Sequence, residues 1–308
     1  MPQDSAYLPV RTARTRSVPL RGLHYQLHEW GDVGSVTPET PALVFAHGWM
    51  DVGASFQFIV DELARLEGER RYVVAFDWRG FGGSSSGGAD AFWFPDYLGD
   101  LEALLDILAP ELSVDLAGHS MGGNVAMSYA GVRPGRIRRL VNLEGFGMPD
   151  APAERSPDRL AKWLDELKTP ASLRPYATLE DVARRLMKNN PRLPTARAHW
   201  LAPHWAAQRA DGQWHILGDP AHKRVNPMLY RAAEILAAWR RIEAPMLWLE
   251  GAQTDVGRFW GTGYPREEFE SRLAQVRAVQ RLVLQDCGHM LHHDQPAACA
   301  KAIRAFLD

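Results

Sequence analysis

Short apolar runs recur along the chain, separated by segments whose apolar residues follow a helical period. The runs are rich in β-branched and aromatic residues, which is typical of strands buried on both faces of a sheet. They cover residues 41–48, 72–78, 114–120, 139–145, 245–251 and 281–287. The helical patterns cover residues 55–68, 94–110, 122–134 and 295–307. This alternation predicts an α/β fold with a mostly parallel sheet and helices on both faces.

The alternation has two exceptions. Residues 17–31 predict an antiparallel hairpin at the edge of the sheet. Residues 147–226 contain no run that predicts a strand, but they contain helical patterns at 158–168, 179–189 and 194–210. We therefore expect residues 147–226 to form a helical cap, inserted into a core domain made of residues 1–146 and 227–308.

The predicted cap has its own local signals. Ser156 before Pro157, and Thr178 three residues before Asp181, predict helix starts. Its tryptophans are expected to fasten the cap to the body rather than to line a pocket. They are Trp163, Trp200, Trp205 and Trp214.

Composition narrows the classes of function. The chain has 308 residues, of which 46% are hydrophobic and 23% charged, so it can bury a large core. A net charge of −2 argues against nucleic-acid binding. Cys287 and Cys299 lack metal-ligand spacing and predict free thiols, and no stretch is long and apolar enough to span a bilayer. We expect a cytoplasmic protein that acts on a small molecule, without metal or organic cofactor.

The sequence VDLAGHSMGGNVAMSYA, residues 114–130, places Ser120 at a corner between a buried strand and a small-residue helix. In an open parallel sheet, the carboxyl ends of the strands border the ligand crevice. Gly118 and Gly122 leave room for a strained turn that projects the serine hydroxyl into that crevice. The stretch therefore predicts a nucleophile elbow.

With three further motifs, the chain resembles the α/β-hydrolase family, in its capped serine-hydrolase branch of esterases and meta-cleavage-type hydrolases. The resemblance extends from about residue 20 to the end of the chain. Its motifs begin at His47-Gly48-Trp49, at Asp77-Trp78-Arg79-Gly80, at Gly118 and at Gly288-His289-Met290. It implies the α/β-hydrolase fold and a Ser–acid–His triad.

A serine hydroxyl needs a general base, and histidine has a suitable pKa for that role. His289 follows the last predicted strand and is the expected base, in part from the family resemblance. His292 and His293 lie in the same loop and are expected to pack at the start of the next helix. The base in turn needs a carboxylate to orient it.

Three acids could orient His289. Asp255 follows the strand at 245–251, and the order Ser120, Asp255, His289 is the order that this fold uses. Glu144 at the end of the preceding strand is the alternative acid, and Asp286 beside the last strand is a weaker one. We expect Asp255 to be the catalytic acid.

Acyl transfer also needs donors for the oxyanion. The backbone N–H of Met121, after the nucleophile, is one, and the resemblance implies that of Trp49 as the second. Asp77 is expected to be structural, bonding backbone in its glycine-rich loop. Trp49, Phe146 and Met148 are the apolar residues expected to contact substrate.

These residues predict a serine hydrolase that cleaves carboxylic esters of small to medium hydrophobic acyl compounds through an acyl-enzyme on Ser120. A serine at the elbow argues against family branches that use a carboxylate nucleophile. One alternative is a carbon–carbon bond hydrolase of the meta-cleavage type, marked by a basic residue that binds a substrate carboxylate. The cap offers Arg184, Arg185, Arg192 and Arg197 for this purpose. Another alternative is a slow-turnover receptor of the same fold.

Overall fold

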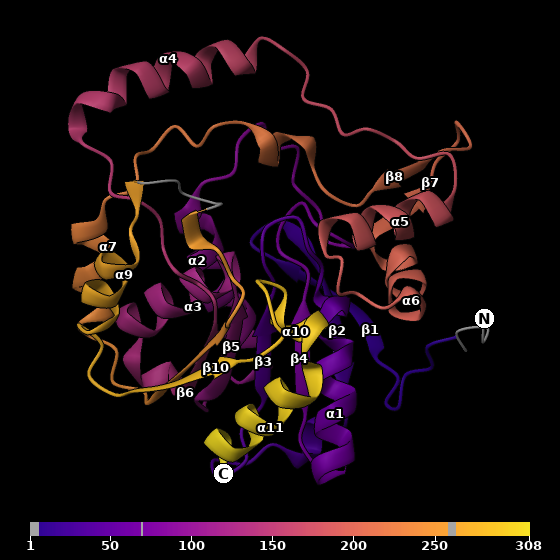
Figure 1. Cartoon of the computed structure of the whole chain (residues 1–308), viewed down its shortest axis with the longest axis vertical. Helices are drawn as coiled ribbons and strands as arrows, with labels where there is room; N and C mark the ends of the chain where they lie inside the picture. Colours follow the sequence, from indigo (N-terminus) through magenta and orange to yellow (C-terminus); the bar gives the residue numbers. More distant parts are fainter. Residues whose placement is uncertain (1–5, 69, 258–262) are drawn as a thin grey trace.

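The structure is a computed structural model, and it describes residues 6–68, 70–257 and 263–308 (Figure 1). Within these residues the chain forms an eight-stranded sheet in the order β1-β2-β4-β3-β5-β6-β9-β10. The strands are β1 (Arg14–Leu20), β2 (Leu23–Trp30), β3 (Leu43–Ala46), β4 (Val73–Phe76), β5 (Val114–His119), β6 (Ile137–Leu143), β9 (Met246–Gly251) and β10 (Val279–Leu284). β4, β3, β5, β6, β9 and β10 run parallel, which confirms the mostly parallel sheet.

The antiparallel part of the sheet lies at one edge. β1 and β2 form the predicted hairpin, and β2 pairs antiparallel with β4. β3, β4 and β5 are buried along their whole length, as expected for strands covered on both faces.

Helices cover both faces of the sheet (Figure 1). The core helices are α1 (Gln57–Glu67), α2 (Phe94–Leu108), α3 (Met121–Val132), α7 (Ala232–Trp239), α9 (Arg266–Leu273), α10 (Leu291–Asp294) and α11 (Pro296–Leu307). α1 and α11 pack on one face, in an apolar cluster with residues of β3 and β9. α2, α3 and α9 contribute to a second cluster on the other face. The α/β fold predicted from the alternating pattern is therefore confirmed.

The chain between β6 and β9 holds the segment predicted as a cap. It contains α4 (Ser156–Leu167), α5 (Leu179–Asn189), α6 (Thr195–Trp205), β7 (Ala206–Gln208) and β8 (Trp214–Ile216). The helix predicted at 194–210 ends at Trp205, because the following residues pair in the short β7–β8 hairpin. The described 3₁₀ turns are Val33–Ser35, Gly53–Phe56, Pro134–Arg136, Ala153–Arg155 and Pro220–Lys223.

The helices of this segment differ in how firmly they are attached. α5 and α6 share an apolar cluster with Val52 and Phe58 of the core, whereas α4 buries no residue. α5 begins with the predicted signal, since Thr178 and Asp181 form a reciprocal capping box. Figure 1 shows α4 standing apart from the sheet, above the other elements.

The structure also bears on the predictions about the cysteines and about membrane-spanning segments. Both cysteines are free thiols, and both are buried. Among the described residues, no helix combines the length and apolar character that a membrane crossing requires.

Candidate active site

Ser120 lies between the end of β5 and the start of α3, with a φ angle of +51°. An added Cβ on Gly118 would lie 2.4 Å from the carbonyl oxygen of Gly122, and one on Gly122 would lie 2.2 Å from that of Ala46. Side chains at these positions would therefore clash with backbone. The strained turn and its glycines match the geometry predicted for a nucleophile elbow.

His289 approaches this serine from the loop after β10. Its Nε2 lies 3.0 Å from Ser120 Oγ, a distance at which the hydroxyl can donate its proton to the ring. Its Nδ1 lies 2.6 Å from Oε2 of Glu144, which accepts a hydrogen bond from Nδ1–H. The three side chains thus form a continuous chain from hydroxyl to imidazole to carboxylate.

Glu144 is built into the end of β6. Its φ angle is +58°, and only 1% of the residue is exposed. Its second oxygen, Oε1, accepts hydrogen bonds of 2.6 Å from the backbone N–H of Gly251 and from the hydroxyl of Thr254. A buried carboxylate needs such partners to remain charged, and these fix its orientation toward His289.

This arrangement places the carboxylate of Glu144, the alternative acid, rather than that of Asp255 in the printed contact with His289. Asp255 follows Thr254 at the end of β9, but its residue is exposed to solvent, and the carboxylate on Nδ1 of His289 is that of Glu144. The physical reason is the loop after β9, which directs the hydroxyl of Thr254, one residue earlier, toward the site. The alternative acid of the sequence prediction therefore occupies the position expected for Asp255.

The neighbouring histidines surround the site without replacing His289. His119 Nε2 lies 2.8 Å from the backbone oxygen of His289 and so helps to hold the loop that carries this residue. His292 and His293 are buried at the start of the C-terminal helices, as predicted. Burial lowers the pKa of His119 well below its usual range and that of His293 to about 3, so both rings are neutral at pH 7.

The loop after β3 passes directly beside the nucleophile. An added Cβ on Gly48 would lie 3.3 Å from Cβ of Ser120. His47 fixes this loop, because its Nδ1–H donates to Gly48 O at 2.7 Å and its Nε2 accepts from Trp78 N–H at 2.9 Å. Trp49 follows, and Met50 has a φ angle of +56°.

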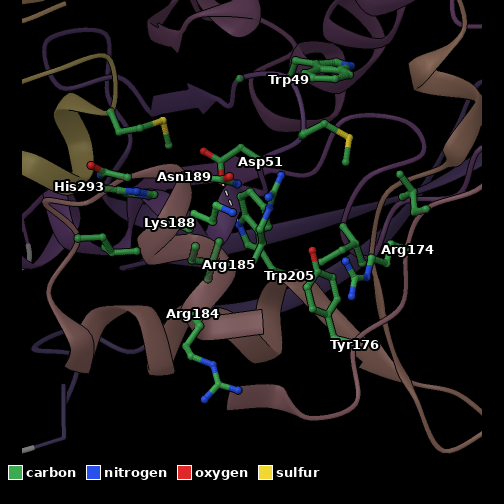
Figure 2. Close-up of a pocket in the computed structure, with 18 of the residues that line it drawn as sticks. Trp49, Asp51, Arg174, Tyr176, Arg184, Arg185, Lys188, Asn189, Trp205 and His293 are labelled. Atoms are coloured by element: carbon green, nitrogen blue, oxygen red, sulfur yellow. Dashed lines mark hydrogen bonds between the residues drawn. The ribbon is translucent and has the colours of Figure 1, made fainter. Parts of the chain in front are cut away.

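Asp51 joins this loop to the rest of the site. Its Oδ1 accepts hydrogen bonds from the backbone N–H of Val52, at 2.9 Å, and from the hydroxyl of Ser55. The same oxygen accepts from Trp205 Nε1 in α6 at 3.2 Å, which Figure 2 marks with a dashed line, while Oδ2 lies 3.2 Å from His292 Nε2. Burial opposes ionisation of Asp51, but the contact with His292 holds its pKa below the usual range.

Three of these side chains also have donor atoms suited to a metal ion. Asp51, His292 and His293 each offer one ligand atom, and these atoms lie within 4.8 Å of one another. Asp51 and His292 are already hydrogen-bonded to each other. We therefore interpret the group as part of the support of the loop after β3.

Asp77 has the structural role that the sequence predicted. Its two carboxylate oxygens accept hydrogen bonds from the backbone N–H of Gly53 at 2.7 Å and of Gly83 at 2.8 Å. Its Oδ1 lies 3.3 Å from Nε2 of His28. Among the described contacts, none joins Asp77 to Ser120 or His289.

A cavity of about 900 Å³ opens over Ser120 and His289, and Figure 2 shows the residues around it. We use two names for its walls. The floor comprises Gly48, Trp49, Met50, Asp51, His119, Ser120, His289, Met290 and His293. The roof comprises 173–177, Asp181, Arg184, Arg185, Leu186, 188–190, Leu193, Trp205, Ile216 and Lys223.

Of the three residues predicted to contact substrate, one lines the cavity and two do not. Trp49 lines the cavity and is 51% exposed. Phe146 instead lies in the core, with its ring against Trp248 and Phe269, and Met148 binds Arg272 through its carbonyl oxygen. Neither is among the residues that line the described cavity, so for these two the contact with substrate stays a prediction.

The roof includes side chains that sequence reasoning placed differently or missed. Trp205 both lines the cavity and fastens α6 to Asp51, so it performs both roles considered for the cap tryptophans. Arg184 and Arg185 line the cavity, whereas Arg192 binds Gln253 and Arg197 lies over the ring of Phe58. Lys188 was missed, although its place on α5 one turn after Arg184 and Arg185 was a usable signal.

Comparison with known proteins agrees with this geometry. Residues 43–302 match the model of the alpha/beta hydrolase family. A 3-hydroxybutyrate-oligomer hydrolase from Cupriavidus necator is 30% identical over 301 residues, covering 92% of this chain and 94% of that protein. An sn-1-specific diacylglycerol lipase from Xenopus laevis is 31% identical over 297 residues, covering 96% and 86%.

Solved structures show the same fold. The thioesterase domain from the curacin biosynthetic pathway superposes with a TM-score of 0.80 at 23% identity, covering 96% of this chain and 99% of that one. The fold and the site define a serine hydrolase of the esterase and lipase type. The chain belongs to the alpha/beta hydrolase family.

Proposed function

We propose that the protein hydrolyses carboxylic esters through an acyl-enzyme on Ser120, with His289 as general base and Glu144 as the acid that orients it. The observation that carries this proposal is the chain of contacts at 3.0 Å and 2.6 Å that joins the three side chains beneath an open cavity. Residues 147–226 act as the cap that forms the roof of this cavity.

In the first half of the reaction, Ser120 Oγ attacks the ester carbonyl carbon while His289 Nε2 takes the hydroxyl proton. The carbonyl π electrons move to oxygen, and the backbone N–H groups of Met121 and Trp49 stabilise that charge. Met121 suits this role because it begins α3, where first-turn N–H groups have no intrahelical acceptor. Collapse of the intermediate expels the alcohol, which receives the proton from His289.

In the second half, water attacks the acyl carbon. His289 takes one water proton and returns it to Ser120 Oγ as the carboxylic acid leaves. Glu144 stabilises the imidazolium in both halves, and its buried, hydrogen-bonded carboxylate changes position little.

Two further facts support an ester substrate. A relative that covers 92% of this chain is named for the hydrolysis of 3-hydroxybutyrate oligomers, which are linear esters, and another is named as a lipase. The cavity volume of about 900 Å³ suits a small to medium substrate.

The first test is labelling with a fluorophosphonate, read by intact-protein mass spectrometry in the wild type and in Ser120→Ala. We expect one stoichiometric adduct on the wild type and none on the variant. Multiple turnovers of p-nitrophenyl butyrate then separate an enzyme from a slow-turnover receptor. A folded wild-type protein that forms no adduct would contradict the proposal.

A carbon–carbon bond hydrolase with the same triad is the second candidate. The observation that favours it is the presence of Arg185 among the cavity residues, because its guanidinium suits a substrate carboxylate. Turnover of a vinylogous ring-cleavage ketone at a higher kcat/KM than any ester would make it the first candidate.

A further inference from the structure

The lining of the cavity carries an excess of positive charge, in contrast to the chain as a whole. Five cations and two carboxylates line the cavity, although the whole chain has a net charge of −2. The two carboxylates are both engaged, since Asp181 pairs with Arg184 and Asp51 contacts His292. The remaining cations are Arg174, Arg185, Lys188 and Lys223.

Within the described parts of the chain, none of these four cations lies within 4.0 Å of a carboxylate oxygen. Other arginines of this chain commonly have such partners. Arg138, for example, pairs with Asp115 at 2.7 Å, and Arg266 pairs with Glu250 at 2.8 Å. Unpaired cations gathered around one concave site raise the local concentration of anions there, because the low-dielectric walls focus their field.

The position of two of these cations on α5 is set by the packing of that helix. α5 buries Val182, Ala183 and Leu186 in the apolar cluster that it shares with α6 and with core residues. Arg185 and Lys188 lie outside this buried face and have exposed side chains. Figure 2 shows Arg184 turned away from the other labelled residues, in agreement with its ion pair to Asp181. Arg185 and Lys188 are therefore the cations on α5 that remain available to a ligand.

We infer that the substrate carries an anionic group, a carboxylate in the first instance, which Arg185 and Lys188 bind while the scissile carbonyl lies at Ser120. This inference rests on the proposed function and adds a substrate class to it. A planar guanidinium and an ammonium group both suit a carboxylate, the first by paired hydrogen bonds and the second as a point charge. The ester substrate is then a hemiester or a hydroxy-acid ester rather than a neutral one.

The test compares esters that differ only in this charge. On the acyl side, the monoanion p-nitrophenyl hemiadipate is compared with p-nitrophenyl 6-methylheptanoate, in which an isopropyl group replaces the carboxylate. On the alcohol side, 4-(butyryloxy)butanoate is compared with 4-methylpentyl butyrate by titration of the released acid. Enzyme-free rates are subtracted from all four. We expect kcat/KM to favour the anion by about tenfold in at least one pair, and less as the salt concentration rises.

The double variant Arg185→Gln/Lys188→Gln removes both charges without touching the buried face of α5. We expect it to abolish the preference for the anion and to leave kcat/KM for the neutral esters within about twofold. Lys301→Gln, an exposed lysine on α11, is the matched control and is expected to keep the full preference.

The failures can be told apart. Absence of a preference in both pairs, a preference that survives the double variant, or labelling of Ser120 without hydrolysis of any of the four esters would overturn the inference. Absence of labelling at Ser120 would instead contradict the proposed function itself.

Discussion

The floor and the roof of the cavity are built in opposite ways. On the floor, Asp51 is buried, and its carboxylate accepts hydrogen bonds from Val52, Ser55 and Trp205. On the roof, Arg185 and Lys188 are exposed and have no carboxylate partner among the described residues. The difference indicates that the floor holds catalytic atoms in place, whereas the roof presents charge to a ligand.

The floor also binds together elements that are distant in sequence. Asp51 contacts Trp205, which is 154 residues away, and His292, which is 241 residues away. Because such contacts cross from the body to α6 and to α10, a change at Asp51 is expected to reach the catalytic atoms. A change at an exposed roof residue is expected to affect substrate choice alone.

Among variants that keep the three triad side chains, Gly122→Ala in the nucleophile turn is expected to have the largest effect. The new Cβ would lie 2.2 Å from the carbonyl oxygen of Ala46, so β3 and the nucleophile turn must separate. We expect kcat to fall by about a hundredfold or more for every ester, because a displacement near 1 Å has that cost. Gly135→Ala, where the added Cβ meets nothing within 4 Å, is the control. Wild-type kcat in Gly122→Ala would show that the elbow tolerates movement.

Asp51→Asn is expected to have the next largest effect. It keeps the size of the side chain but removes the charge that faces His292 and changes an acceptor into a donor. We expect kcat to fall about ten- to a hundredfold with little change in KM, since the residue supports the loop of Trp49 rather than binding substrate. A change confined to KM would instead mean that Asp51 contacts the substrate.

The pH dependence of stability tests the burial of His222. It is stacked between Phe81 and Phe92, and burial lowers its pKa to about 4. The unfolded chain, with a histidine pKa near 6.5, therefore binds the proton first as the pH falls, and stability is lost between about pH 6.5 and 4. His222→Phe should reduce that loss by on the order of 2 kcal/mol, measured as unfolding free energies in denaturant at pH 7 and 4.5. An unchanged pH dependence would contradict the low pKa.

The smallest effect is expected from Thr178→Ala, at the start of α5, the helix that carries Arg185 and Lys188 of the roof. This change removes one half of the capping box of α5 and should cost about 1 kcal/mol of local stability. Hydrogen exchange should increase in α5, while kcat for a neutral ester stays within about twofold. A large fall in kcat would mean that floor and roof are not separable.

Those parts of the site that depend on neighbouring residues and on strand order could be predicted from the sequence. Ser120 and its glycines form one continuous motif, and His289 follows the last strand in a short loop, so strand order alone brings them to the same edge. The strands of the sheet could also be predicted from the sequence, because buried strands are short apolar runs.

The acid could not be decided in this way. Glu144 and Asp255 follow adjacent parallel strands, β6 and β9. The strand order therefore allows either carboxylate to reach His289. The choice depends on which side chain the loop after β9 turns inward, and that is Thr254. Phe146 shows a similar limit, since its proximity in sequence to Glu144 does not reveal that its ring packs on Trp248.

The most direct test of the site compares Glu144→Gln with Asp255→Asn in parallel. Each variant replaces one carboxylate by an amide of the same size, and kcat is measured on p-nitrophenyl butyrate with fold checked by circular dichroism. We predict that Glu144→Gln lowers kcat by about 10³–10⁴-fold, because the amide no longer holds the imidazole tautomer and charge. Asp255→Asn should stay within about threefold of the wild type, as an exposed residue. The reverse order of effects would contradict the triad of Ser120, His289 and Glu144.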